Sequence, residues 1–329
     1  MSHIPVLLKE VIYYLDPKSN QNFIDCTIGG GGHAKVILEK IGPKGKLLGI
    51  DLDERSIEIS KENLRRFGIS ICNLEVAKKR NRIFLVQGNF KNLKQIKEKY
   101  FHFPIYGVLF DLGFSSFQVE TGIKGFSFLK EGPLDMRYDP RGQNLTAEKI
   151  INEWPEKELI KILRTYGEEK ETTKIARSIC RTREKIRIKT TRQLADLICK
   201  VKKEKRFSPF RDIHPATKVF QALRIAVNDE LNNLKEALPQ ALEILEPRGR
   251  LVVISFHSLE DRIVKQFFVR ESKDCLCSSE IPVCQCKHKA SLRILTKKII
   301  RPTQEEVGKN PRSRSARLRA AVKISNSTG

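Results

Sequence analysis

Short apolar runs alternate with helical patterns along this chain, and that alternation is the strongest constraint on its fold. Each run ends in turn residues or acids and is typical of a buried strand; the runs span residues 22–29, 47–53, 83–90, 106–113 and 249–256. Between the first two runs, residues 35–41 have a helical pattern that Gly42 and Pro43 end. Strands that alternate with helices form a parallel sheet covered on both faces. The sequence therefore predicts an α/β fold.

The interval between the fourth and fifth strands is too long for one crossover connection. It holds a glycine-rich loop and then helical patterns, one of which opens with a capping box at Thr190 and Gln193. We therefore predict three parts. Residues 1–113 form the first part of the core, residues 114–212 an inserted, mostly helical substrate-recognition subdomain, and residues 213–329 the second part of the core with a basic C-terminal tail.

Two further patterns lie in the last part. A set of apolar residues at helical spacing predicts one amphipathic helix that returns to the sheet; its members are Phe220, Leu223, Val227, Leu231, Leu234 and Leu238. Nearer the C-terminus, residues 291–299 and 317–324 are expected to form a late antiparallel pair of strands.

Positive charge dominates the composition and is clustered. The 329 residues carry 62 Lys and Arg against 39 Asp and Glu, a net charge of +23. Residues 181–206 carry a net +8 and residues 287–329 a net +10. Such clustering is typical of a polyanion partner, and we expect nucleic acid. No apolar run approaches the ~20 residues of a membrane span, and no secretory signal is recognisable, so we expect a cytoplasmic protein without a membrane partner.

The glycine run Gly29–Gly32 between the first two strands indicates a ligand site. A Walker P-loop is excluded, because Lys35 stands between Ala34 and Val36. A dinucleotide fingerprint fits Gly29, Gly31 and Ala34, with Asp51 following 22 residues after Gly29. S-adenosylmethionine uses the same architecture, so this stretch alone leaves both cofactors open. A non-catalytic RNA-binding or ribosome-assembly factor would explain the charge, but not the glycines and acids at strand ends.

Longer motifs distinguish between these alternatives. The chain resembles the bacterial small-subunit ribosomal RNA methyltransferase H family along essentially its whole length. The motifs that carry the resemblance are HIPVLLKEVI (3–12), DCTIGGGGHA (25–34), DLGFSSFQ (111–118), GFSF (125–128), GPLDMR (132–137), YGEE (166–169), HPATKVFQALRIAVNDEL (214–231), ISFHSLEDRIVK (254–265) and NPRSRSARLR (310–319).

The resemblance implies a Rossmann-like class I methyltransferase with an inserted helical subdomain. It implies N4-methylation of a cytidine in the decoding region of small-subunit (16S) ribosomal RNA, with S-adenosyl-L-methionine as the cofactor. The contacts it implies with the cofactor are Gly31, Gly32, His33, Asp51, Phe90, Asp111 and Gln118. Whether the substrate is naked RNA or an assembling small subunit stays open, as does a homodimer.

Asp111 is the candidate catalytic residue. In many amino-methyltransferases an Asp/Asn-Pro-Pro-aromatic loop follows the fourth strand, and here the same slot reads Asp111-Leu112-Gly113-Phe114. We hypothesise that Asp111 or a nearby backbone carbonyl accepts a hydrogen bond from N4, while Phe114 or Phe117 packs the base. The family usually has Pro at Phe117, Ser at Ala34 and Met at Tyr138, which leaves the fine shape of this loop open.

Two other sets of polar residues admit functional and structural interpretations. Ser255, His257 and Asp261 could suggest a hydrolase triad, but Ser258 and Asp261 fit a capping box that opens the helix after the fifth strand. Asp135 and Arg137 form an ion pair or contact RNA, and we favour the substrate-side role.

Four cysteines stand in two C-x-C pairs: Cys275, Cys277, Cys284 and Cys286. Four thiolates can bind zinc tetrahedrally, but C-x-C is less usual for structural zinc than C-x₂-C. From the sequence we therefore expect free thiols and no metal.

Overall fold

The computed structural model describes residues 4–69, 71–72, 82–113, 124–128, 130–202, 214–278 and 283–325. The chain separates into two compact units. The first, the sheet unit, combines residues 1–113 with residues 231–329, and the second, the helical unit, is residues 114–230.

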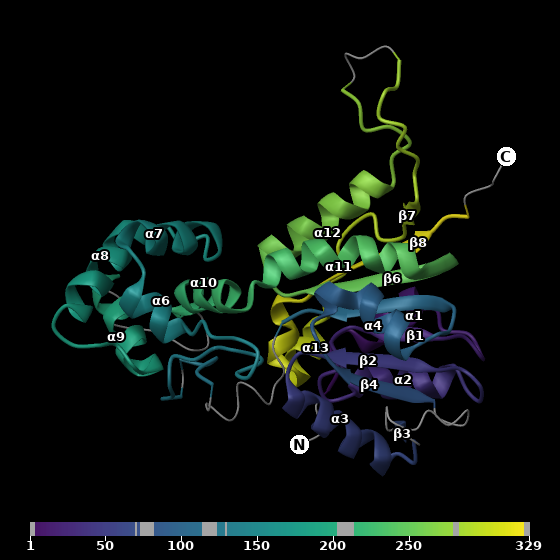
Figure 1. Ribbon diagram of the computed structural model, residues 1–329, viewed down its shortest axis with the longest axis horizontal. Coiled ribbons are helices and arrows are strands. Elements are labelled where there is room, and N and C mark those ends of the chain that lie inside the picture. Colours follow the sequence, from purple (N-terminus) through teal and green to yellow (C-terminus); the bar gives the residue numbers. More distant parts are fainter. Residues whose placement is uncertain are drawn as a thin grey trace. The chain divides into compact units, whose positions relative to one another are not determined.

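The sheet unit contains an eight-stranded sheet of order β3-β4-β2-β1-β5-β6-β8-β7 (Figure 1). The strands are β1 (Phe23–Asp25), β2 (Leu47–Asp51), β3 (Ile71–Cys72), β4 (Ile83–Gln87), β5 (Ile105–Asp111), β6 (Leu245–Ser255), β7 (Leu292–Ile294) and β8 (Arg317–Lys323). All pairings among β1 to β6 are parallel, whereas β8 is antiparallel to both β6 and β7. Both the parallel sheet and the late antiparallel pair predicted from the sequence are confirmed.

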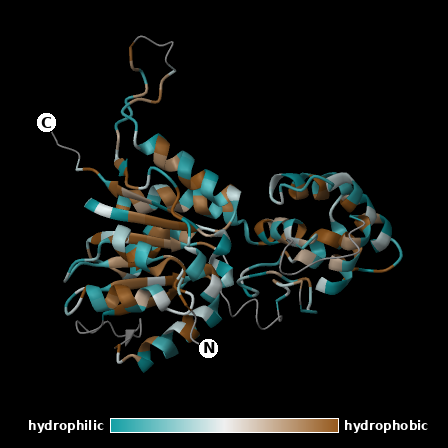
Figure 2. Ribbon diagram, turned by 180° about the vertical axis from the view of Figure 1, so that it is seen from behind, coloured by the Kyte–Doolittle hydropathy of each residue, from teal (hydrophilic) through white to brown (hydrophobic). Residues whose placement is uncertain are grey.

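Alternate residues of the central strands β1 and β5 pack on opposite faces of this sheet, which is why these strands are mainly apolar; Figure 2 shows the hydrophobic residues in brown. On one face Ile24 and Val108 pack with α4 (Leu93–Tyr100), α11 (Glu230–Ile244) and α12 (Ser258–Glu271). On the other face their neighbours Phe23 and Leu109 pack with the remaining large helices of the unit, which are α1 (Leu8–Leu15), α2 (Gly32–Lys40) and α3 (Glu54–Arg66).

The helical unit has its own hydrophobic core. Among its described residues, the helices are α6 (Ala147–Glu153), α7 (Glu156–Thr165), α8 (Thr172–Arg183), α9 (Thr191–Val201) and α10 (Thr217–Asn228). The predicted capping box is present: the Thr190 side chain accepts from the Gln193 N–H, and Gln193 accepts from Thr190. A second cap, Thr146, accepts from the Lys149 N–H at the start of α6. These caps satisfy backbone groups that a helix start leaves unpaired.

Two expectations about the end of the insertion are wrong. The predicted single helix from Phe220 to Leu238 is two helices, because Asp229 adopts a left-handed conformation with φ 51° and ends α10. The structure also assigns α10 to the helical unit, whose core it joins through Val219 and Leu223, whereas the sequence analysis assigned residues from 213 on to the sheet unit.

The basic C-terminal segment is also not a tail. It contains β7, α13 (Gln304–Lys309), the 3₁₀ helix η2 (Pro311–Ser315) and β8, and β8 lies inside the sheet between β6 and β7. Within it, Arg319 forms a two-bond ion pair with Asp261 of α12, at 2.6 and 3.1 Å. Among the described helices, none combines the length and the apolar character that crossing a bilayer requires.

Candidate active site

The candidate site lies at the carboxyl ends of the parallel strands. β1 pairs with β2 on one side and with β5 on the other. The strand order therefore reverses at β1: β2, β4 and β3 lie on one side of it, and β5 and β6 lie on the other. Open α/β sheets bind ligands outside the carboxyl ends of strands at such a switch point. The predicted residues of the described chain gather at this edge.

The glycine run forms the turn between β1 and α2. Gly29 and Gly31 have φ values of +49° and +80°, a region that residues with a Cβ adopt at a cost. Gly31 is the N-cap of α2, so Gly32 and His33 open that helix. A Cβ on Gly32 would lie 2.6 Å from Cγ of Pro5, so close packing within the protein itself requires this glycine.

Asp51, the last residue of β2, fixes the glycine turn. Its Oδ2 accepts a hydrogen bond from the Gly29 N–H at 3.0 Å, and its Oδ1 accepts from the Asp53 N–H at 2.9 Å. Each carboxylate oxygen can accept a second hydrogen bond. Through these two hydrogen bonds Asp51 holds the glycine turn in place at the end of β2.

Asp25, the last residue of β1, is a site residue that the sequence analysis missed. Its side chain is 2% exposed, and its Oδ1 accepts from the Thr27 N–H at 3.1 Å. Burial raises the pKa of Asp25 to about 7, and the nearby Asp51 adds to the rise while the hydrogen bonds from Thr27 oppose it. The sequence signal for this contact is the position of Asp25 two residues before Thr27, because an aspartate side chain often accepts a hydrogen bond from the backbone N–H two residues later.

Asp111, the last residue of β5, is joined to Asp25 through Thr27. The Asp111 N–H donates to Oγ1 of Thr27 at 2.7 Å. The Asp111 Oδ1 is buried and has no hydrogen-bond partner in the described part of the chain. Burial raises the pKa of Asp111 well above its usual range, and the charges of Asp25 and Glu260 raise it further.

The helix after β6 brings Glu260 to the same edge, with a capping box one residue earlier than predicted. The N-cap of α12 is His257 rather than Ser258, and Glu260 rather than Asp261 is its partner. Glu260 Oε2 accepts from the Phe256 N–H at 2.8 Å. Asp261 is turned instead toward Arg319, so the triad interpretation has no geometric support.

Phe90 opens the 3₁₀ helix η1 (Phe90–Asn92) directly after β4. Its half-buried ring lies edge-on to Phe110, with ring centroids 5.5 Å apart. An aromatic ring at this strand end is suitably placed to contact a planar ligand group. Gln118, together with Phe114 and Phe117, lies outside the described residues.

In the helical unit, Asp135 and Arg137 form an ion pair, which the sequence analysis considered beside the substrate-side role that it favoured. The Arg137 guanidinium donates to both carboxylate oxygens of Asp135, at 2.7 and 2.8 Å, and to the Gln143 carbonyl at 2.7 Å. Asn228, which the sequence analysis left unassigned, is buried and accepts from the Tyr138 N–H at 3.0 Å. These contacts hold the loop of residues 132–144 against the unit's core.

The carboxylates of Asp25, Asp51 and Asp111 at one strand edge define what the site can bind. Buried acids of like charge repel one another, so a cationic ligand would relieve the cost of ionising them. S-adenosylmethionine carries a sulfonium and an ammonium group, and its ribose offers hydroxyl donors. The donors and acceptors on these residues therefore fit that cofactor.

The family model and the curated relatives that match this chain belong to one methylase family. The family model described as the MraW methylase family matches residues 1–324. A ribosomal RNA small subunit methyltransferase H from Dehalococcoides mccartyi is 47% identical over 322 residues, which cover 98% of this chain and 86% of that protein. A protein of the same name from Thermomicrobium roseum is 46% identical, covering 99% and 94%. An rRNA methylase structure from Streptococcus thermophilus covers 99% and 100% with 10% identity and a TM-score of 0.42.

Proposed function

The chain belongs to the MraW methylase family, and on that premise we propose that it methylates small-subunit ribosomal RNA. It is an S-adenosylmethionine-dependent rRNA methyltransferase, and its target atom is N4 of a cytidine in the decoding region. The observation that carries this proposal is the buried Oδ1 of Asp111 at the switch point of the sheet, which has no hydrogen-bond partner among the described residues. A ribosomal substrate also agrees with the cytoplasmic location expected from the sequence.

The cofactor occupies the carboxyl edge of β1, β2, β4 and β5 in this proposal. Asp51 accepts hydrogen bonds from the ribose hydroxyls, and Phe90 packs against the adenine. Gly31 and Gly32 let the backbone approach the ligand, and His33 lies in the first turn of α2 beside the methionine part. The family resemblance adds Gln118 to the expected contacts.

Asp111 performs the proton chemistry. The bound cofactor supplies an electrophilic methyl group on a sulfonium. Cytosine N4 is a weak nucleophile because its lone pair is delocalised into the ring, so the protein must position it in line with that methyl. Asp111 accepts a hydrogen bond from the N4 amino group, and its raised pKa makes it a better proton acceptor when N4 loses a proton after transfer.

Positively charged surface binds the RNA, and the target base must be unstacked to enter this site. A base inside a stacked duplex cannot present N4 to the methyl group, so the target is flipped or already single-stranded. The helical unit is the proposed substrate-recognition part, with residues 181–206 as its basic segment. Some of this charge already has partners in the fold: Arg187 pairs with Glu148 and Glu153.

Methyl transfer from isotopically labelled S-adenosylmethionine tests the proposal. The acceptors are unmodified small subunits, naked small-subunit RNA, large subunits and transfer RNA, and the RNA is then digested to nucleosides for mass spectrometry. Label in N4-methylcytidine from small-subunit acceptors alone is the expected result. Label on another atom, or only on another RNA, would overturn the proposed substrate.

A further inference from the structure

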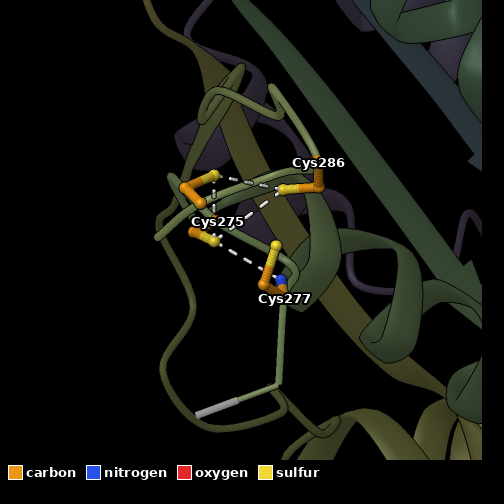
Figure 3. Close-up of side chains that lie close together, drawn as sticks. Cys275, Cys277 and Cys286 are labelled. Atoms are coloured by element: carbon orange, nitrogen blue, oxygen red, sulfur yellow. Dashed lines mark hydrogen bonds between the residues drawn. The ribbon is translucent and has the colours of Figure 1, made fainter. Parts of the chain in front are cut away.

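The loop between α12 and β7, residues 273–290, brings its four cysteines together. Cys275 and Cys277 precede the tip of the loop, and Cys284 and Cys286 follow it. All four sulfur atoms lie within 4.8 Å of one another. Figure 3 shows the sulfurs of Cys275, Cys277 and Cys286 directed toward a common centre. Two separate C-x-C pairs therefore meet as one cluster.

The spacing of the Cys275, Cys284 and Cys286 sulfurs matches tetrahedral coordination, and the Cys277 sulfur lies within 4.8 Å of all three. Zinc bound by thiolates has Zn–S distances of about 2.3 Å, which places the sulfurs of a regular tetrahedron about 3.8 Å apart. Here the Sγ atom of Cys275 lies 3.4 Å from that of Cys284 and 3.8 Å from that of Cys286, and the Sγ atoms of Cys284 and Cys286 are 3.7 Å apart. A disulfide would require about 2.05 Å, and all four thiols are free.

Backbone N–H groups are directed at these sulfurs. The Leu276 N–H donates to Cys286 at 3.3 Å, the Cys277 N–H to Cys275 at 3.4 Å and the Gln285 N–H to Cys277 at 3.4 Å. Such hydrogen bonds stabilise thiolate ligands and orient them around a metal. Neutral thiols are weak acceptors and need no such arrangement.

The backbone directly after the cluster is strained. Lys287 adopts φ 53°, a left-handed conformation that is unfavourable for a residue with a Cβ. This residue directly follows Cys286. A strained residue next to a ligand-like cluster points to a function for the geometry.

The loop has no core of its own to hold it in this shape. Among its described members, residues 273–278 and 283–290, none is buried. Leu276 is 43% exposed and Val283 is 72% exposed. The loop projects beyond the end of α12 (Figure 1), and its base is closed by the Ser291 N–H, which donates to the Glu271 carbonyl at 2.8 Å. A segment without buried apolar surface requires a cross-link to stay folded.

We propose that Cys275, Cys277, Cys284 and Cys286 form a structural zinc site that closes this loop. Four thiolates fill the tetrahedral shell and leave no open position, so the ion is structural and not catalytic. The cluster is in the chain segment after α12, apart from the strand edge that carries Asp25, Asp51 and Asp111. This inference replaces the free thiols expected from the sequence, and it does not depend on the proposed function.

Metal analysis of the full-length protein is the decisive experiment. The chain is purified under reducing conditions without chelator, and its metals are measured by plasma mass spectrometry. We expect about one zinc ion per chain. The double variant Cys284→Ser/Cys286→Ser should lose it, while the matched control Cys180→Ser/Cys199→Ser, altered at two cysteines of the helical unit, should keep it.

Limited trypsin digestion gives a second readout that does not depend on activity. Loss of zinc should raise cleavage after Lys273, Lys287 and Lys289 by roughly tenfold or more, because the loop then opens locally. Binding of S-adenosylhomocysteine, measured by calorimetry, confirms that the rest of each variant is folded. Iron in place of zinc, disulfides detected by mass, zinc retained in the Cys284→Ser/Cys286→Ser variant, or no zinc uptake by reduced protein would each overturn the proposal.

Discussion

Replacing Asp25 by asparagine should stabilise the protein, and by more at alkaline than at acidic pH. The Asp25 carboxyl has a pKa of about 7 in the folded protein, against 3.8 for an ordinary aspartate. Between these values the folded chain binds more protons than the unfolded chain, so the contribution of Asp25 to stability falls as pH rises through this window. Asparagine keeps an oxygen for the Thr27 N–H at this position and cannot ionise.

The magnitude follows from the two pKa values. A shift of about 3 units corresponds to a total cost of about 4 kcal/mol once the buried carboxyl is fully ionised. Evaluated with the same pKa values, this cost is about 2 kcal/mol at pH 5.5 and about 4 kcal/mol at pH 8.5. The stability advantage of Asp25→Asn over the parent should therefore grow by about 2 kcal/mol between these two pH values.

Urea unfolding of cofactor-free protein at pH 5.5 and pH 8.5 measures this difference. Asp196→Asn, at an aspartate whose side chain is 66% exposed, is the matched control. An advantage of Asp25→Asn that is equal at both pH values within about 0.5 kcal/mol would refute the argument, because titrating groups that are distant from Asp25 cancel in the comparison. The same variant removes a negative charge from the proposed cofactor site, so calorimetry should show weaker binding of S-adenosylmethionine.

Four further outcomes are expected. Asp111→Asn should lower the rate of methyl transfer by about 10²–10⁴-fold with RNA binding retained, as single-turnover assays would show; full turnover would remove Asp111 from the mechanism. Gly32→Ala should destabilise the fold by about 1–3 kcal/mol, because the new methyl group meets Pro5; an unchanged urea midpoint would contradict this. Lys202→Met should cost about 3–5 kcal/mol, since it leaves the buried Glu169 carboxylate without its 2.7 Å partner, and a Glu169→Gln/Lys202→Met double variant should recover part of that loss. The affinity for RNA should fall steeply between 50 and 200 mM salt as counterions are released, and a flat response in filter binding would count against a phosphate-binding surface.

The sequence predicted the sheet well because its strands are buried on both faces and therefore stand out as apolar runs. It placed strand ends less well: the first run was predicted to reach residue 29, whereas β1 ends at Asp25 and the chain leaves the sheet to form the glycine turn. The two-residue strand β3 carries too little pattern to be found. Asp229 shows the same limit, since a single left-handed residue divides a continuous apolar stripe into two helices.

The sequence predicts those candidate site residues that belong to a motif or end a strand. It does not predict those whose position depends on tertiary packing. Gly31, Asp51 and Asp111 were placed by their motifs and strand ends. Asp25 was missed because its burial depends on strands that are distant in sequence. The choice of His257 over Ser258 as a helix cap depends on backbone angles at one residue, and the convergence of the four cysteines depends on the path of the loop.

The sheet unit is assembled from both ends of the chain, and this has a consequence for biosynthesis. Near the N-terminus, the Leu7 N–H donates to Glu306 at 2.7 Å, and β8, among the last described residues, lies inside the sheet against β6. The helical unit is continuous in sequence and has its own core, so it can fold while the ribosome is still making the rest. The sheet cannot be completed until residues 317–323 have left the exit tunnel. A chain truncated before β8 therefore leaves β6 as an edge strand with unpaired backbone groups, and the sheet is complete only after residues 317–323 have been synthesised.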